Sequence, residues 1–189
     1  MIDFRAASET LASLIVQVST DDLGRPTPCE NYTVADLLMH IDEGATGFTV
    51  VADGAISSPA VADVDDDASR LRVADHVRDL GRAWARAQAW VGDSDAGGLE
   101  LSKETWGKIA LTEVIIHGWD LAVATGHGFS PPEHLVHACH SHVEVFVPDA
   151  PLPQLWGEQV QAGETASLLD RTVAITGRDP RSWHLVPPG

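Results

Sequence analysis

Hydrophobic positions along most of the chain recur at spacings of three and four residues, which is the period of an amphipathic helix. In the first twenty residues these positions are Phe4, Ala7, Leu11, Leu14 and Val18. They predict a first helix, and the segment 20–32, with a glycine and two prolines, interrupts the pattern. Thr33 followed by Asp36 resembles a capping box. The pattern therefore predicts a second helix over residues 33–54.

Two further long helices and two smaller ones are predicted in the rest of the chain. Residues 53–69 are small and acidic and predict an exposed loop. The apolar positions that follow have the spacing of a helix seam: Val73, Val77, Leu80, Trp84, Ala87 and Val91. Residues 92–104 predict another loop. A fourth helix is expected from Thr105 to Thr125, with Gly126 as its stop.

The C-terminal part adds a helix that begins at Ser130 as its N-cap and a short helix within residues 164–176, and we expect Trp183 to pack back on the body. Four long helices and two smaller ones predict an all-α fold, an up-and-down four-helix bundle with one or two additional C-terminal helices. We expect one domain over residues 1–189 and no sheet larger than a two-stranded ribbon.

The composition and net charge of the chain indicate which classes of binding partner are unfavourable. The chain has 189 residues, 44% of them hydrophobic, which suits one domain with a sizeable core. Its formal net charge of −16 disfavours binding to nucleic acid or to an anionic membrane. We expect neither a signal peptide nor a membrane span, because no apolar run reaches 18 residues. The two cysteines, without a CxxC pair, are expected to be free thiols in a cytoplasmic protein.

The fourth predicted helix carries polar side chains that its apolar sequence does not explain. Glu113, His117 and Asp120 follow one another at i, i+4 and i+7, so they lie within an arc of about 60°. A carboxylate and an imidazole beside a core face are costly unless they are paired or bind a metal. Glu and His one turn apart can reach the same ion.

A third ligand would have to come from another element. His40 lies in the middle of the second predicted helix among apolar residues, and Gly44 and Gly47 lie close to its stripe. Glycine is unfavourable inside a helix, so the two glycines indicate either close backbone approach or room for a ligand. The alternative is that His40 is an ordinary hydrogen-bonded core histidine.

A second histidine cluster also has metal-competent spacing. His137 lies four residues after Glu133, and His140 lies three after His137 and four before Glu144. Glu133 stands at a helix start, where acidic residues are favoured by the helix dipole. The alternative interpretation of this cluster is an amphipathic helix with a histidine-rich polar face.

Three segments resemble one known family. "RPTPCENYTVADLLMHI" and "ALTEVIIHGWDLAVATG" are similar to the two motifs of the mycothiol-dependent maleylpyruvate isomerase N-terminal-like proteins, in the DinB-like superfamily. "LLDRTVAITGRDP" resembles the end of a short, single-domain actinobacterial branch described as metal-binding. The chain departs from the motif at Tyr32, where the family usually has Trp. The second domain of the maleylpyruvate isomerases is not expected here.

The resemblance implies a four-helix bundle with a divalent metal, usually zinc, held by His, Glu and His. The positions that match are His40, Glu113 and His117. From its spacing, Asp120 would either orient His117 from outside the ligand set or be a surface carboxylate at the end of the helix. Three protein ligands leave one zinc position open, which is typical of catalytic sites. The family also implies mycothiol or a similar thiol as cosubstrate.

These inferences predict a zinc-dependent S-transferase or isomerase that uses a low-molecular-weight thiol and an electrophilic substrate. Neither Cys29, in the loop before the second helix, nor Cys139, on a helix without proposed ligands, is expected to be needed. The alternatives are a metal-dependent hydrolase, a ferrous oxygen-activating site, and a non-catalytic metal-binding bundle. A homodimer also remains open.

Overall fold

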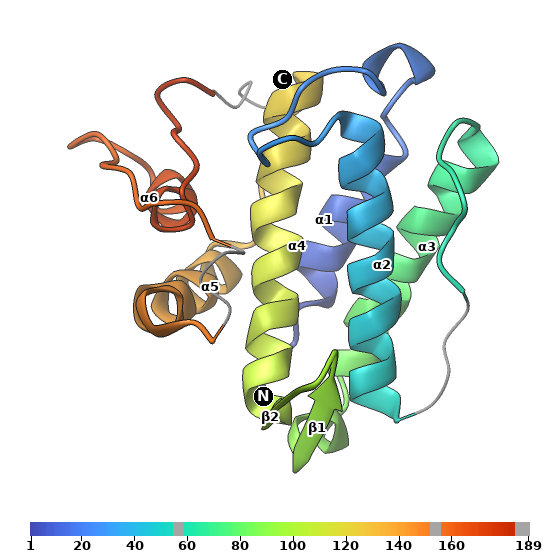
Figure 1. Cartoon of the computed structure of the whole chain (residues 1–189), viewed down its shortest axis with the longest axis vertical. Helices are drawn as coiled ribbons and strands as arrows, with labels where there is room; N and C mark the ends of the chain where they lie inside the picture. The colour runs from blue at the N-terminus through green and yellow to red at the C-terminus, as the bar shows by residue number, and fades with distance from the viewer. Residues whose placement is uncertain (55–58, 152–155, 184–189) are drawn as a thin grey trace.

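The computed structural model describes residues 1–54, 59–151 and 156–183, and this part of the chain is mostly helical (Figure 1). Its α-helices are α1 (Arg5–Ile15), α2 (Val34–Asp53), α3 (Asp67–Trp84), α4 (Lys103–Thr125), α5 (Glu133–Phe146) and α6 (Leu168–Ile175). Short 3₁₀ turns lie at Thr20–Asp22, Ala87–Trp90 and Val147–Asp149. The predicted capping box is present, because Thr33 accepts a hydrogen bond from the backbone N–H of Asp36 and the Asp36 carboxylate accepts one from that of Thr33.

The first four helices pack on one another and enclose the core. Helix α1 contacts α3 and α4, and α2 contacts the same two helices. Figure 1 shows α2 and α4 side by side, with α5 and α6 on the far side of α4. Among the largest fully buried side chains are Trp84 from α3 and Trp119 from α4.

Helix α4 is buried on most sides because it contacts α1, α2 and α5. A helix in this position is apolar all round rather than amphipathic. The close packing is clearest at Gly118, where a Cβ would lie 2.6 Å from Cε2 of Phe129. Only glycine fits there, so Phe129 packs directly on the backbone of α4 beside His117.

The segment predicted as a loop before α4 forms a β-hairpin instead. Strand β1 (Asp93–Ala96) pairs antiparallel with β2 (Leu99–Ser102). Gly97 and Gly98 connect them, with φ values of 63° and 82°. Two consecutive positive φ angles are typical of a two-residue hairpin turn, for which Gly-Gly is a recognised sequence. In the described residues no larger sheet is present, as predicted.

Two helix ends differ from the prediction. Helix α3 ends at Trp84, and Val91, which was expected on its seam, is 61% exposed. The apolar spacing continues across a 3₁₀ turn, which periodicity alone does not distinguish from a helix. Helix α5 begins at Glu133 after Pro132, so Ser130 is not its N-cap. The end of α4 is as predicted, with Gly126 in a left-handed conformation at φ 73°.

The C-terminal segment folds back on the helical body. Helix α5 packs against α4, and α6 packs on α5. The backbone N–H of Val160 donates to the carbonyl of Ala174, and Trp183 packs against the core as predicted.

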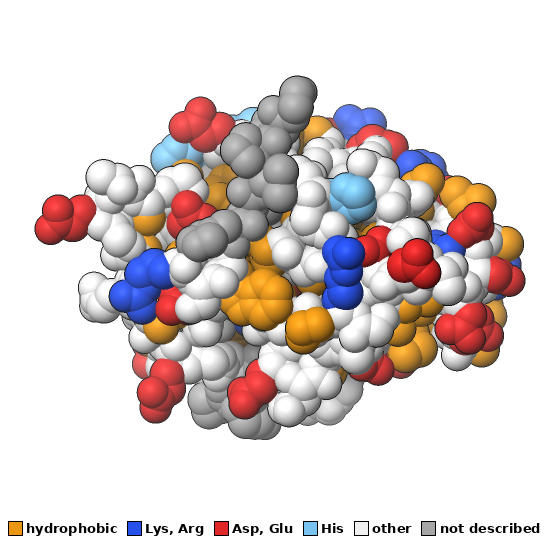
Figure 2. Space-filling view, turned by 90° about the horizontal axis from the view of Figure 1, so that it is seen from above, with side chains coloured by type: hydrophobic (Ala, Val, Ile, Leu, Met, Phe, Trp, Pro, Cys, Tyr) orange, Lys and Arg blue, Asp and Glu red, His pale blue; other side chains and the backbone are white. Residues whose placement is uncertain are grey.

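The surface agrees with the acidic composition. Figure 2 shows acidic side chains spread over this face, with basic side chains among them rather than gathered in one patch. Within the described residues, no helix combines the length and the apolar character that crossing a membrane requires.

Candidate metal centre

The structure brings His40, Glu113 and His117 together between α2 and α4. Nε2 of His40 lies 3.1 Å from Nε2 of His117 and 3.5 Å from Oε2 of Glu113. Nε2 of His117 lies 3.0 Å from the same carboxylate oxygen. One donor atom from each of the three residues therefore points to a common place.

The donor set fits a divalent metal in both chemistry and spacing. Two nitrogens 3.1 Å apart cannot both present lone pairs to each other unless a proton or a cation lies between them. Ligands about 2.0–2.1 Å from a tetrahedral zinc ion lie roughly 3.3 Å apart, close to the three distances found here. Two imidazoles and one carboxylate suit zinc or ferrous iron, whereas magnesium and calcium prefer oxygen ligands.

Asp120 determines which nitrogen of His117 faces the centre. Its Oδ2 lies 3.0 Å from Nδ1 of His117, and its side chain is fully buried. A carboxylate accepts hydrogen bonds, so Nδ1 carries the proton and Nε2 is left for the centre. The sequence left open whether Asp120 was a surface carboxylate at a helix end, and its complete burial rules out that interpretation.

Asp120 is itself held by Arg178, which the sequence analysis did not identify. Nε of Arg178 donates to Oδ1 at 3.2 Å and Nη2 donates to Oδ2 at 2.9 Å. Arg178 lies in the turn after α6, and only 10% of its side chain is exposed. The one available signal was that a buried carboxylate such as Asp120 requires a cationic partner. The sequence did not show which of its basic residues this would be.

The charges around the centre hold the carboxylates ionised. Burial opposes ionisation of Asp120, but the charge of Arg178 lowers its pKa. Burial likewise opposes ionisation of Glu113, and the charge of His117 lowers the Glu113 pKa well below its usual range. For His117, burial is outweighed by the charge of Glu113 and the contact with Asp120, which raise its pKa to about 9. Without a metal, a proton between these groups neutralises their negative charge.

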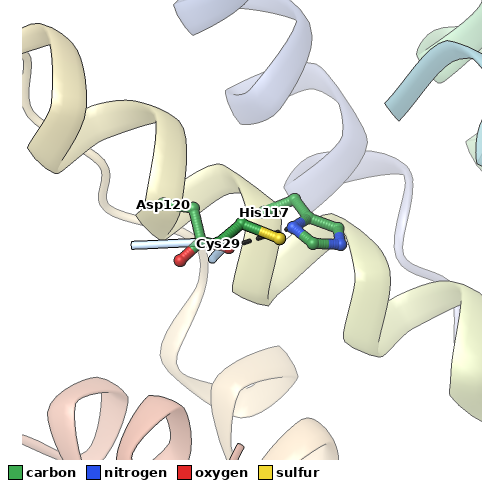
Figure 3. A group of neighbouring side chains, drawn as sticks. All are labelled: Cys29, His117 and Asp120. Atoms are coloured by element: carbon green, nitrogen blue, oxygen red, sulfur yellow. Dashed lines mark hydrogen bonds and ion pairs between the residues drawn. The ribbon is translucent and has the colours of Figure 1, made fainter. Parts of the chain in front are cut away.

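Cys29, which the sequence analysis expected not to be needed, lies beside this centre. Its Sγ, a nitrogen of His117 and an oxygen of Asp120 all lie within 4.8 Å of one another (Figure 3). The three could in principle form a second ligand group, but Arg178 already neutralises Asp120, and Nδ1 of His117 is occupied by its hydrogen bond. Burial raises the pKa of the Cys29 thiol to about 11, so the neutral thiol predominates at neutral pH.

The rival histidine cluster does not converge. The side chain of His137 is 63% exposed, and its Nε2 lies 3.8 Å from Glu133. His140 contacts Thr172 and Glu144 instead. Within the described residues, the groups of three or more potential ligands are those formed around His117.

The centre is open on one side only. On the core side, a cavity of about 10 Å³ borders the three predicted ligands and is lined by apolar residues. That volume holds a water-sized atom at most. The side chains of His40 and Glu113 are 36% and 27% exposed, so a ligand has to approach from their exposed side. A Cβ at Gly47 would meet nothing within 4 Å, which excludes close backbone approach at this exposed position.

The fold and the centre define a mostly helical protein whose second and fourth helices carry one potential metal site. Residues 4–122 match the family described as the mycothiol maleylpyruvate isomerase N-terminal domain. The chain belongs to this family, as the resemblance predicted, and the description of the family relates it to mycothiol.

Two relatives come from Mycobacterium tuberculosis, the uncharacterised proteins Rv0738 of strain H37Rv and MT0763 of strain CDC 1551. Each is 31% identical over 183 residues, covering 88% of this chain and 94% of the relative. No solved structure matches the chain.

Proposed function

We propose that this chain is a divalent-metal protein that uses a low-molecular-weight thiol, of the mycothiol type, in an S-transfer or isomerisation reaction. His40, Glu113 and His117 would hold the metal, which we propose to be zinc. The observation that carries the proposal is the convergence of Nε2, Oε2 and Nε2 at separations of 3.0 to 3.5 Å. Membership of a mycothiol-related family supports the choice of cosubstrate.

The packing of the helices supports a DinB-like four-helix bundle as the fold that presents this site. Each of α1 and α2 contacts both α3 and α4, as neighbours around a square would. We propose that α5 and α6 extend the same domain, because α5 packs on α4 and α6 packs on α5. In such bundles, side chains from facing helices build metal sites in the core.

The charge balance favours an anionic ligand. Asp120 and Arg178 form a buried pair that is neutral overall. Glu113 would offset one of the two charges of a divalent ion, so one positive charge would remain for an incoming thiolate. When bound, zinc supplies Lewis acidity, which lowers the pKa of a thiol or a water molecule.

The residues of the chain have separate tasks in this proposal. Asp120 accepts a hydrogen bond from Nδ1–H of His117 and keeps the Nε2 of His117 directed at the centre. The exposed sides of His40 and Glu113 form the entrance, and Tyr32 packs edge-on to His40 there, with ring centroids 5.6 Å apart. The closed core side restricts the thiol and the electrophile to this entrance.

The experiment is a titration of metal-free protein with Co²⁺, followed by addition of a small thiol. We expect one metal ion per chain and, at neutral pH, a sulfur-to-metal charge-transfer band. His40→Ala and His117→Ala should lose the metal, and Glu113→Gln should bind it more weakly because an amide is a poorer ligand than a carboxylate.

The exposed His137 provides the matched control, since His137→Ala should bind metal like the wild type. Unchanged binding in the His40→Ala and His117→Ala proteins would overturn the ligand set. Metal binding without a thiol band, but with hydrolysis of activated esters, would replace thiol chemistry with the hydrolytic alternative.

A further inference from the structure

Arg178 lies outside the part of the chain that matches the family, yet it reaches the proposed metal centre. The match covers residues 4–122, and Arg178 follows α6. It is joined to the centre through two buried contacts in series, Arg178 to Asp120 and Asp120 to His117. We propose that Arg178 is a positioning residue of the metal centre, which acts through Asp120 to hold His117 in its ligating orientation.

The local backbone is arranged to bring Arg178 to α4. After α6, Gly177 has φ 90°, and a Cβ there would lie 2.5 Å from the Cα of Gly157. The turn therefore requires glycine, both for its left-handed conformation and for the close approach of the two backbone segments. The next residue is Arg178, whose backbone N–H donates to the carbonyl of Val173.

The guanidinium group is fixed from several directions. Nε and Nη2 hold both oxygens of Asp120, and Nη1 donates to the carbonyl of Thr176 at 3.0 Å. This two-point contact fixes the plane of the carboxylate as well as its charge. Oδ2 of Asp120 accepts from both Arg178 and His117, so rotation of the carboxylate would disturb the His117 contact.

This inference rests on the proposed function, because it requires His117 to be a metal ligand. Lysine at position 178 would retain the positive charge and lose the two-point contact. Changes in groups that orient ligands from outside the ligand set typically weaken metal binding 10- to 100-fold. We therefore expect Arg178→Lys to weaken Co²⁺ binding at fixed pH by about tenfold or more.

The matched control is Arg181→Lys, because Arg181 belongs to the same segment, is 61% exposed and pairs only with Asp179 among the described residues. Its Co²⁺ affinity should equal that of the wild type. Thermal unfolding of each metal-free protein, followed by circular dichroism, separates an effect on the centre from a general loss of stability.

A double-mutant cycle tests whether Arg178 acts through Asp120. In an Asp120→Asn background the pathway is already broken, so Arg178→Lys should cause no further loss of Co²⁺ affinity. Additive losses would overturn the proposal and give Arg178 a merely structural role. If Arg178→Lys fails to fold, the Asp120→Asn, Arg178→Gln pair replaces it. The two amides that these substitutions introduce can hydrogen-bond to each other. The proposal requires the Asp120→Asn, Arg178→Gln protein to bind Co²⁺ as weakly as the protein with Asp120→Asn alone.

The outcomes also separate this inference from the proposed function. A wild-type protein that binds no Co²⁺ overturns both. A wild-type protein that binds Co²⁺ with the same affinity as Arg178→Lys overturns only the role of Arg178.

Discussion

Two helical glycines should respond in opposite ways to the same substitution. A Cβ at Gly118 would lie 2.6 Å from Cε2 of Phe129, whereas a Cβ at Gly47 would meet nothing within 4 Å. Alanine is favoured over glycine inside a helix by about 1 kcal/mol. Gly47→Ala should therefore stabilise the protein, and Gly118→Ala should do so only if Phe129 can move away.

The structure indicates that Phe129 has little freedom to move. It is 3% exposed, so the ring cannot move into solvent without uncovering the core. Overpacking typically costs about 1–3 kcal/mol, and a contact this short belongs at the upper end. Subtracting the helical gain of about 1 kcal/mol leaves a net loss of roughly 2 kcal/mol for Gly118→Ala.

The assay is thermal unfolding of the metal-free proteins, monitored by circular dichroism. For a chain of this size 1 kcal/mol corresponds to about 2–4 °C. Gly118→Ala should thus lower the melting temperature by roughly 4–8 °C, and Gly47→Ala should raise it by about 2–4 °C. Phe129→Leu should reduce the cost of Gly118→Ala, because it removes the ring that clashes. If Gly118→Ala stabilises the protein as much as Gly47→Ala does, the close packing described here is wrong.

Other predictions concern histidines and cysteines. Burial, together with the charge of Lys108, lowers the pKa of His142 to about 4, and its Nε2 has no hydrogen-bond partner in the described chain. In the unfolded chain the pKa of this histidine is near 6.5, so the unfolded state binds a proton on His142 more readily than the folded state does. Stability should be full above about pH 6.5 and fall as the pH drops toward about 4. The free energy of unfolding, measured by chemical denaturation, should depend less on pH in His142→Phe than in the wild type. If the two proteins show the same pH dependence, it does not arise from His142. Cys29→Ser with Cys139→Ser should retain thiol-transfer activity, and its loss would place the nucleophile on the protein. His137→Ala with His140→Ala should retain full Co²⁺ binding in a metal titration.

The sequence predicted the helices well where periodicity and caps agree. Helix α2 has its capping box at Thr33, and α4 ends at a left-handed Gly126. It failed where two structures share one pattern. The apolar spacing continues from Trp84 to Val91 through a 3₁₀ turn, so the seam appeared longer than α3. The hairpin strands are four residues each, too short for alternation to be clear.

The three residues that converge at the candidate centre could be singled out in the sequence because two of them share one helix. Spacing in α4 places Glu113 and His117 on the same side, and His40 followed from its apolar surroundings and from the family motif. Contacts between distant segments could not be found in this way. Spacing within a helix says nothing about the loop that carries Cys29 or the turn that carries Arg178. Burial of Asp120 required a cation, but only the fold determines which one reaches it.

The predicted ligands and Arg178 belong to parts of the fold that differ in how extensively they are packed. The three predicted ligands lie on α2 and α4, within the packed helices, whereas Arg178 belongs to a segment that rests mainly on α5. Native proteins open locally in cooperative units, and peripheral units open more often than the core does. Detachment of residues 156–183 would remove the arginine while leaving the three predicted ligands in place. If the centre binds a metal as proposed, hydrogen exchange of α6 amides should occur on the timescale of metal release, long before the amides of α4 exchange.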